Sequence, residues 1–169
     1  MTANAFVDTN ILVYAVDPAV PRKQAIARQW LQRLWDEQRG RTSFQVLDEY
    51  YYVATRRLKP RLSGEKAWAD VEACFEWEPL PTGRELLRAA RHIEKRHRLS
   101  WWDSLIVAAA RLQGCSLLLT EDLQHGLIID GVTVHDPFAA RVADGTAVYE
   151  AAHVAPRHRP RGRPRRAAA

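Results

Sequence analysis

The sequence has 169 residues, 47% of them hydrophobic, which suits one domain with a full core. Its two cysteines, Cys74 and Cys115, show neither a C-x-x-C spacing nor a disulfide framework, so a disulfide-stapled secreted scaffold is excluded and buried free thiols are expected. No stretch is apolar for long enough to span a membrane, and the N-terminus has no signal-peptide pattern. We therefore expect a cytoplasmic protein without membrane contact.

The net charge of +5 is concentrated in the C-terminal segment. Residues 156–169, P-R-H-R-P-R-G-R-P-R-R-A-A-A, contain six arginines and no acidic residue, and removing them leaves −1 for residues 1–155. Such a segment cannot build a core, so it is either a disordered tail or a binder of phosphates. We expect a compact domain over residues 1–138, an alanine-rich extension of uncertain structure over 139–155, and the tail over 156–169.

The first half of the sequence alternates between strand and helix patterns. Residues 4–8 form a short apolar run that predicts a buried strand ending at an aspartate. Apolar residues then recur at helical spacing over 21–37, over about 44–58 after a Thr-Ser cap, and from 63 to 75. Residues 78–80 could add a short strand.

The second half continues the alternation. The capping box Thr82-Gly83-Arg84-Glu85 predicts a helix with an inward face made by Leu86, Leu87, Ala90 and Ile93. A second capping pattern at Ser100 opens a strongly apolar helix, which suggests burial against a sheet. Strands are expected at 116–120 and 131–135. This order predicts an α/β fold around a central, mostly parallel sheet.

Four acidic residues stand where strands end or helices pass. They are Asp8 after the first strand, Glu49 one turn into a helix, Asp103 in the first turn of the apolar helix, and Asp122 after the strand at 116–120. Ligands of open parallel sheets bind beyond the carboxyl ends of the strands, and helices start at the same edge. All four carboxylates can therefore reach one cleft.

Each acid also has a purely structural explanation. Asp103 could be a capping acid, Glu49 a surface glutamate and Asp122 the first residue of a turn. Asp8 is the hardest to explain in this way, although Asp8 or Asn10 could cap a helix at Ile11. The joint pattern is a stronger signal than any of its parts.

A cluster of four carboxylates needs compensation. At separations of about 6 Å and an effective dielectric near 20, the six pairwise repulsions sum to roughly 15 kcal/mol, which is comparable with the stability of a whole domain. Protons or a metal cation must therefore neutralise the cluster. The histidines and cysteines have no zinc-like spacing, whereas an all-carboxylate site suits Mg²⁺ or Mn²⁺. Such a site typically hydrolyses phosphodiesters.

Four blocks of the sequence together resemble the PIN-domain family, and within it the VapC-type toxin ribonucleases. The blocks are F-V-D-T-N-I-L at 6–12, Q-V-L-D-E-Y-Y at 45–51, L-S-W-W-D-S-L-I-V-A-A-A at 99–110 and L-T-E-D-L-Q-H-G at 119–126. The resemblance covers roughly residues 4–138. It implies an α/β/α sandwich with a parallel sheet and cleavage of RNA that depends on Mg²⁺ or Mn²⁺.

The resemblance also assigns roles to individual residues. The four acidic positions of the family fall on Asp8, Glu49, Asp103 and Asp122, with Asp8 and Asp103 as the principal metal ligands. Asn10 and Thr120 match polar positions beside the acids and could position a ligand or a water. The resemblance further implies a homodimer inhibited by a small antitoxin protein that covers the cleft.

Two other functions remain open from the sequence. A non-catalytic RNA-binding module could draw its affinity from the basic tail, although an acidic cleft without a metal would repel phosphate. A phosphatase similar to the haloacid dehalogenases also begins with an aspartate after a strand. That chemistry requires a second aspartate two residues later, where this chain has Asn10.

Overall fold

Five strands form one sheet at the centre of the computed structural model, which describes residues 3–139. The strands are β1 (Asn4–Val7), β2 (Gly40–Arg41), β3 (Cys115–Leu119), β4 (Ile128–Ile129) and β5 (Val132–His135). Their order is β2-β1-β3-β5-β4, and only the β4–β5 pair is antiparallel. The prediction of a mostly parallel sheet is therefore confirmed. The predicted extension and tail, apart from residue 139, lie outside the described residues.

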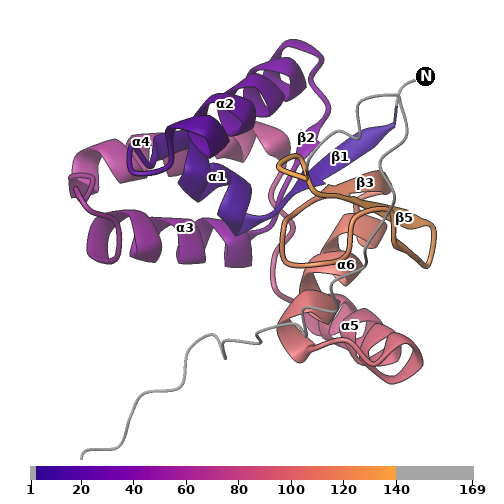
Figure 1. The fold of residues 1–169 in the computed structure, drawn as a ribbon. Helices are drawn as coiled ribbons and strands as arrows, with labels where there is room; N and C mark the ends of the chain where they lie inside the picture. The colour runs from indigo at the N-terminus through magenta and orange to yellow at the C-terminus, as the bar shows by residue number, and fades with distance from the viewer. Residues whose placement is uncertain (1–2, 140–169) are drawn as a thin grey trace, which may run out of the picture.

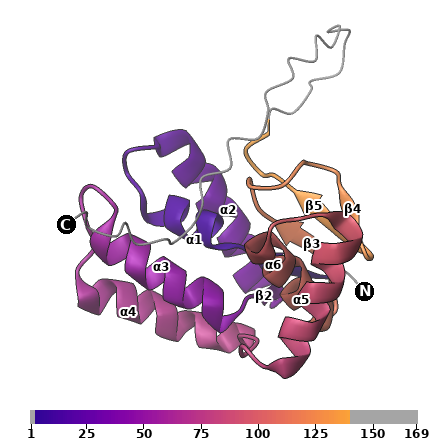
Figure 2. The same ribbon diagram turned by 90° about the horizontal axis from the view of Figure 1, so that it is seen from below.

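The described residues also form six α-helices and one short 3₁₀ helix. They are α1 (Thr9–Val16), α2 (Pro21–Asp36), α3 (Phe44–Arg56), α4 (Gly64–Ala73), α5 (Arg84–His97) and α6 (Trp101–Leu112), with η1 (Cys74–Trp77) following α4. Figures 1 and 2 show α1 and α2 on one side of the sheet and α5 and α6 on the other. The layers are those of the predicted α/β/α sandwich. No helix within residues 3–139 is long and apolar enough to cross a membrane.

The central strands and the helix that covers them owe their positions to burial. Phe6 of β1 and Leu118 of β3 are completely buried, and seven consecutive residues of α6, Ser104–Ala110, are buried as well. A helix that is apolar on most sides must be enclosed, and α6 packs against β3 and β5. The register pairs Val7 with Leu119, so the residues that follow these two strands emerge side by side at one edge of the sheet.

Some boundaries differ from those expected. The predicted strand at 78–80 is reduced to a single bridge between Leu80 and Ser43. The capping box at Thr82 is not formed, because Gly83 is the N-cap of α5 and makes no side-chain bond. Leu87, expected on the inner face of α5, is 42% exposed. The two-residue strands β2 and β4 were not predicted.

Strand β2 depends on a glycine. Trp77 is 2% exposed, and its ring lies against Gly40 so closely that a Cβ at residue 40 would come within 2.2 Å of it. On its other side Trp77 packs against Trp35, with ring centroids 4.6 Å apart. Because β2 ends only two residues before Ser43, the N-cap of α3, this contact helps to place α3.

We expect Gly40→Ala to lower the free energy of unfolding by about 1–3 kcal/mol, since the added methyl overpacks a buried ring. Chemical denaturation followed by circular dichroism measures the change. Gly64→Ala is the matched control, because its nearest neighbour is the hydroxyl of Tyr51 at 3.4 Å and a shift within about 0.5 kcal/mol is expected. Equal stabilities of the two variants would contradict the role given to the contact with Trp77.

A charged cluster joins α5 and α6 to the turn between β4 and β5. Nε2 of His97 lies 2.9 Å from Oδ1 of Asp130, and the guanidinium groups of Arg96 and Arg111 lie 3.9 Å from the same carboxylate. The hydrogen bond to His97 lowers the pKa of Asp130, and the nearby charges of Arg96 and Arg111 add to this effect. The ionised carboxylate is therefore the form that the folded state favours.

A folded-state pKa below the unfolded value gives stability that is present above the unfolded pKa, near 4, and is lost as the pH falls through the folded value. We expect Asp130→Asn to be less stable than the parent at pH 7 and to show a smaller loss of stability between pH 5 and pH 2. Asparagine tolerates the positive φ of 47° at this position, so the backbone remains a fair match. Thermal unfolding across this pH range tests the expectation, and parallel curves for the two proteins would contradict it.

Candidate functional site

Asp8 occupies the first position after β1 and is 2% exposed. It is the N-cap of α1, and its Oδ1 accepts a hydrogen bond of 2.7 Å from the backbone N–H of Thr9. Its Oδ2 accepts bonds from the hydroxyl of Thr120 at 2.8 Å and the amide of Asn10 at 3.3 Å. Three donors therefore offset much of the cost of burying the carboxylate, and they favour its ionised form.

Thr120 connects the ends of the two central strands. It follows β3 directly, is 1% exposed, and donates its hydroxyl proton to Asp8. The same hydroxyl oxygen accepts bonds of 3.1 Å from the amide of Asn10 and from the backbone N–H of Asp122. One side chain thus fixes the carboxylate that follows β1 and the backbone of the loop that follows β3.

Asn10 ties a second acidic residue, Asp122, to Asp8 and Thr120. Its Nδ2 lies 3.2 Å from Oδ2 of Asp122, in addition to its contacts with Asp8 and Thr120. Its own Oδ1 is buried and has no hydrogen-bond partner among residues 3–139. A buried acceptor without a donor is costly, so this oxygen is a position at which a bound water or cation would be stabilising.

Glu49 reaches the same region through Thr9. The hydroxyl of Thr9, which is 3% exposed, donates to Oε2 of Glu49 at 3.0 Å. This bond connects the start of α1 to the middle of α3, forty residues away in the sequence. Thr9 was not identified from the sequence, although it stands between two residues that were.

Asp103 is held by its own helix. The hydroxyl of Ser100 donates to Oδ2 of Asp103 at 2.6 Å and accepts from the backbone N–H of Asp103 at 3.1 Å. Ser100 is the N-cap of α6, so the capping pattern read from the sequence is formed. No hydrogen bond between described residues joins Asp103 to the other three acids, which are connected to one another through Thr9, Asn10 and Thr120.

The donor set is one of oxygen atoms, which fits a hard divalent cation. The carboxylates of Asp8, Glu49 and Asp122, together with the unsatisfied Oδ1 of Asn10, offer the chemistry that Mg²⁺ or Mn²⁺ prefers. Among residues 3–139, no group of three or more histidine, cysteine, aspartate or glutamate side chains is arranged as a metal-binding cluster. Asp8, Asn10 and Asp122 are linked by hydrogen bonds, but within residues 3–139 the carboxylates do not form a complete coordination shell.

A separate polar cluster supports the loop next to Asp122. Glu121 accepts hydrogen bonds from the hydroxyl of Tyr14 and the ammonium of Lys23, which itself lies 4.3 Å from the centre of the Tyr14 ring. Burial and the bond to Glu121 raise the pKa of Tyr14. Burial lowers the pKa of Lys23, but its bonds to Glu121 and Tyr14 outweigh that effect and the net shift is upward. The cluster anchors residue 121 to α1 and α2.

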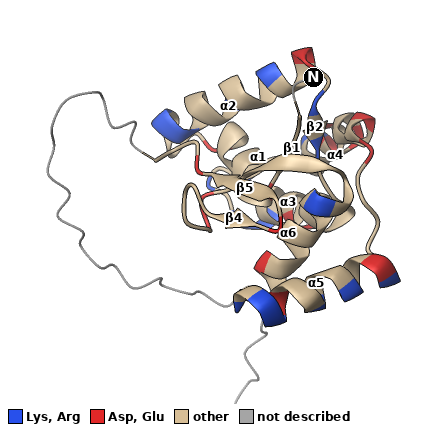
Figure 3. Cartoon of the chain, turned by 90° about the vertical axis from the view of Figure 1, so that its right-hand side faces the viewer, with Lys and Arg blue, Asp and Glu red and all other residues tan. Residues whose placement is uncertain are grey.

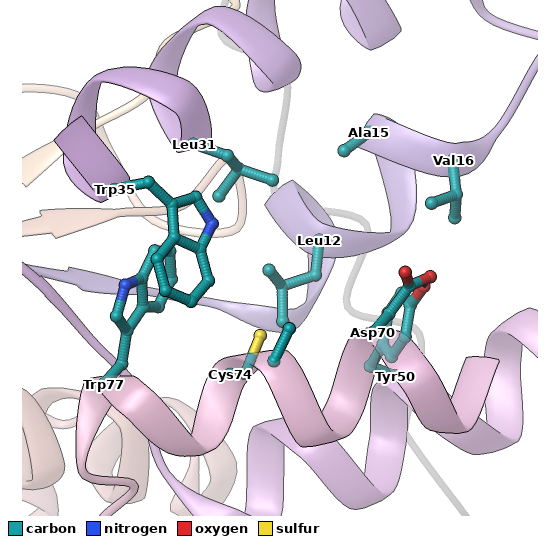
Figure 4. Close-up of a pocket in the computed structure, with 10 residues that line it drawn as sticks. Leu12, Ala15, Val16, Leu31, Trp35, Tyr50, Asp70, Cys74 and Trp77 are labelled. Carbon is teal, nitrogen blue, oxygen red and sulfur yellow. Dashed lines mark hydrogen bonds between the residues drawn. The ribbon is translucent and has the colours of Figure 1, made fainter. Parts of the chain in front are cut away.

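A cavity of about 160 Å³ between α1, α2 and α4 lies apart from the acids. Its walls are mostly apolar. Two polar groups also line it, the hydroxyl of Tyr50 and the carboxylate of Asp70, and the hydroxyl donates a hydrogen bond of 2.6 Å to the carboxylate (Figure 4). Burial and then Asp70 raise the pKa of Tyr50, and the same two causes raise that of Cys74 to about 12. Burial also raises the pKa of Cys115 to about 12.

Both cysteines are buried and free, so the expectation of buried free thiols is confirmed.

Comparison with known proteins adds to this picture. No curated protein matches the chain. Among solved structures, a toxin–antitoxin complex from Klebsiella pneumoniae is similar at a TM-score of 0.57 and 19% identity, covering 80% of this chain and 98% of the other. VapC20 of Mycobacterium tuberculosis, described as a toxin that cleaves the sarcin–ricin loop, has a TM-score of 0.48 and 21% identity, covering 68% and 87%. At these identities the first likeness concerns the fold alone.

The family itself is identified from the sequence. A model of the PIN domain matches residues 5–126, which is more than half of the chain and includes Asp8, Glu49, Asp103 and Asp122. The matched range also contains β1 from its second residue, the whole of β3 and helices α1 to α6. The family predicted from the four sequence blocks is therefore confirmed, and the chain belongs to the PIN domain family.

Proposed function

We propose that this PIN domain is a metal-dependent endoribonuclease and the toxin of a toxin–antitoxin pair. The observation that carries the proposal is the buried Asp8, which Thr120 and Asn10 link to Asp122 at the carboxyl ends of β1 and β3. A carboxylate buried at the edge where parallel sheets bind their ligands points to a functional site. The family match and the fold shared with the Klebsiella toxin–antitoxin complex support the same function.

Asp8 and Asp103 would be the principal ligands of Mg²⁺ or Mn²⁺, with Glu49 and Asp122 completing the site directly or through water. Such an ion supplies a water of lowered pKa and neutralises charge on the phosphate oxygens. The side chains and backbone of the protein orient the metal ligands. Thr120 and the backbone N–H of Thr9 hold the Asp8 carboxylate in one orientation.

Two neutral side chains would position the other groups. The hydroxyl of Thr9 orients Glu49, and the amide nitrogen of Asn10 restrains Asp122. The Oδ1 of Asn10, buried without a partner, would accept a hydrogen bond from a water that approaches the phosphate. Because Asn10 is an amide and cannot transfer a proton as an aspartate does, its place two residues after Asp8 disfavours the phosphatase alternative.

The proposal includes three partners. RNA would be the substrate, a cognate antitoxin would cover the acidic cleft, and a second copy of the chain would complete a homodimer. We place the protein in the cytoplasm, where its RNA substrate is found. A purely RNA-binding function of residues 156–169 is the alternative, and it predicts binding without turnover.

Asp8→Asn should lower RNA cleavage by more than about 100-fold, since a metal ligand and its charge are lost together. Removing repulsion between carboxylates would favour greater stability, but the contacts of Asp8 predict the opposite. One carboxylate oxygen becomes an NH₂ group that faces hydrogen-bond donors, so we expect a loss of about 1–2 kcal/mol. Cleavage of a labelled RNA and denaturant unfolding measure the two effects.

Asp48→Asn is the control for this substitution, because Asp48 precedes Glu49 on α3 and is exposed. It should keep both activity and stability, the latter within about 0.5 kcal/mol. Undiminished cleavage by purified Asp8→Asn would exclude the proposed mechanism.

Metal removal gives an independent test. Treatment with EDTA should abolish cleavage, and added Mg²⁺ or Mn²⁺ should restore it. A cation that binds only the folded state at one hundred times its dissociation constant should also stabilise the protein by about 2.7 kcal/mol, which thermal unfolding detects without any substrate. The shift should be smaller in Asp8→Asn. Full activity in EDTA, or an equal shift in both proteins, would rule out the metal site.

A further inference from the structure

One face of α3 leads away from the acidic cluster. Tyr52 and Arg56 stand three and seven residues after Glu49, so they follow it on the same side of the helix at about 4.5 Å and 10.5 Å along the axis. In Figure 1, α3 starts beside the end of β1 and runs away from the sheet. The face therefore forms a continuous path from a proposed active-site carboxylate to the far end of the helix.

The first residue on this path is an exposed aromatic side chain. Tyr52 is 53% exposed, although a tyrosine on a helix surface can bury its ring against a neighbouring element. The guanidinium of Arg57 lies 5.6 Å from the centre of its ring and donates a bond of 3.4 Å to its hydroxyl. An accessible ring with a cation beside it is the arrangement on which a nucleic-acid base stacks.

The path ends in the densest run of positive charge in the described chain. Residues 56–61, R-R-L-K-P-R, contain four basic residues and no acidic one, whereas residues 1–139 as a whole contain 18 of each. All four basic side chains are exposed, and none forms a salt bridge with another described residue. The helix dipole explains a cation at position 56, in the last turn of α3, but not the charges at 59 and 61.

Helix α5 is the other basic surface, and it differs in kind. Its basic residues are interspersed with Glu85 and Glu94 (Figure 3), and Arg91 pairs with Glu94 while Arg96 lies near Asp130. Helix α5 has no Phe, Tyr or Trp, and its rings are the imidazoles of His92 and His97, the second of which lies against Asp130. It therefore offers charge without a large aromatic side chain on which a base could stack.

We propose that single-stranded RNA leaves the acidic cluster along α3, with a base stacked on Tyr52 and phosphates beside Arg56, Arg57 and the charges at 59 and 61. The proposal rests on the proposed nuclease function, because it names the binding track of that same site. Acidic side chains repel the phosphate backbone, and screening at physiological salt acts over about 8 Å. The cations begin about two helical turns from Glu49, beyond the range of this repulsion, where they can hold the part of the strand that has left the acids.

The test measures binding apart from cleavage. A fluorescent single-stranded oligoribonucleotide is titrated with the full-length protein in EDTA at several salt concentrations, and anisotropy gives the affinity. Tyr52→Ala should weaken binding roughly tenfold, while Tyr52→Phe, which keeps the ring, should stay within about twofold. The double variant Arg56→Gln, Arg57→Gln should lower the slope of log affinity against log salt by about 1.4.

The charge-matched control is Arg88→Gln, Lys95→Gln, two exposed positions of α5. It removes the same charge and should leave the affinity within about twofold. Unchanged affinity in Tyr52→Ala and in the arginine pair would overturn the proposal, as would an equal loss in the α5 control. Loss of binding to a purified antitoxin in these variants, with RNA affinity intact, would likewise overturn it and assign the surface to a protein.

Cleavage by the parent protein is scored in a separate reaction with Mn²⁺. A parent that binds through Tyr52 and the arginines but never cleaves would refute the nuclease function and leave the track supported. A parent that cleaves while every variant binds equally well would refute the track and leave the nuclease standing. The two failures are therefore distinguishable.

Discussion

The hydrogen bond from the Thr120 hydroxyl to the Asp8 carboxylate is the contact on which the site depends. It joins residues 112 positions apart, and it exists because the parallel register places Val7 opposite Leu119. A slip of one residue would turn Thr120 to the other side of the sheet and leave Asp8 buried with fewer donors. The burial of Phe6 and Leu118 in the core therefore sets the geometry of the polar residues that follow them.

Strand β1, strand β3 and helix α6 could be predicted from the sequence, because each is an apolar run with a clear start or stop signal. Strand β2 could not. The role of Gly40, which lets the strand pass close to the ring of Trp77, depends on a residue 37 positions later. The capping box predicted at Thr82 was wrong by one residue, because Gly83 is the N-cap of α5.

For the site, too, local patterns predict some contacts, while others depend on how distant elements pack. That Asp8 and Asp122 lie near each other follows from the ends of parallel strands, and the sequence carries that information. The bond between Thr9 and Glu49 depends on the angle at which α3 crosses α1, which no local pattern encodes. Asp103 shows how a single residue can satisfy two expectations. Its carboxylate and backbone N–H both bond to Ser100, the N-cap of α6, as those of a purely structural acid would, and it remains a candidate ligand.

The two outer strands of the sheet, β2 and β4, are only two residues long. An incoming extended peptide would find few backbone groups to pair with on either border, and short borders of this kind discourage growth of a sheet from one molecule into the next. Association of this domain with a second copy or with a protein inhibitor should accordingly proceed through side chains on its helices. The unpaired backbone that remains at the borders is too short to serve as a template for fibrils.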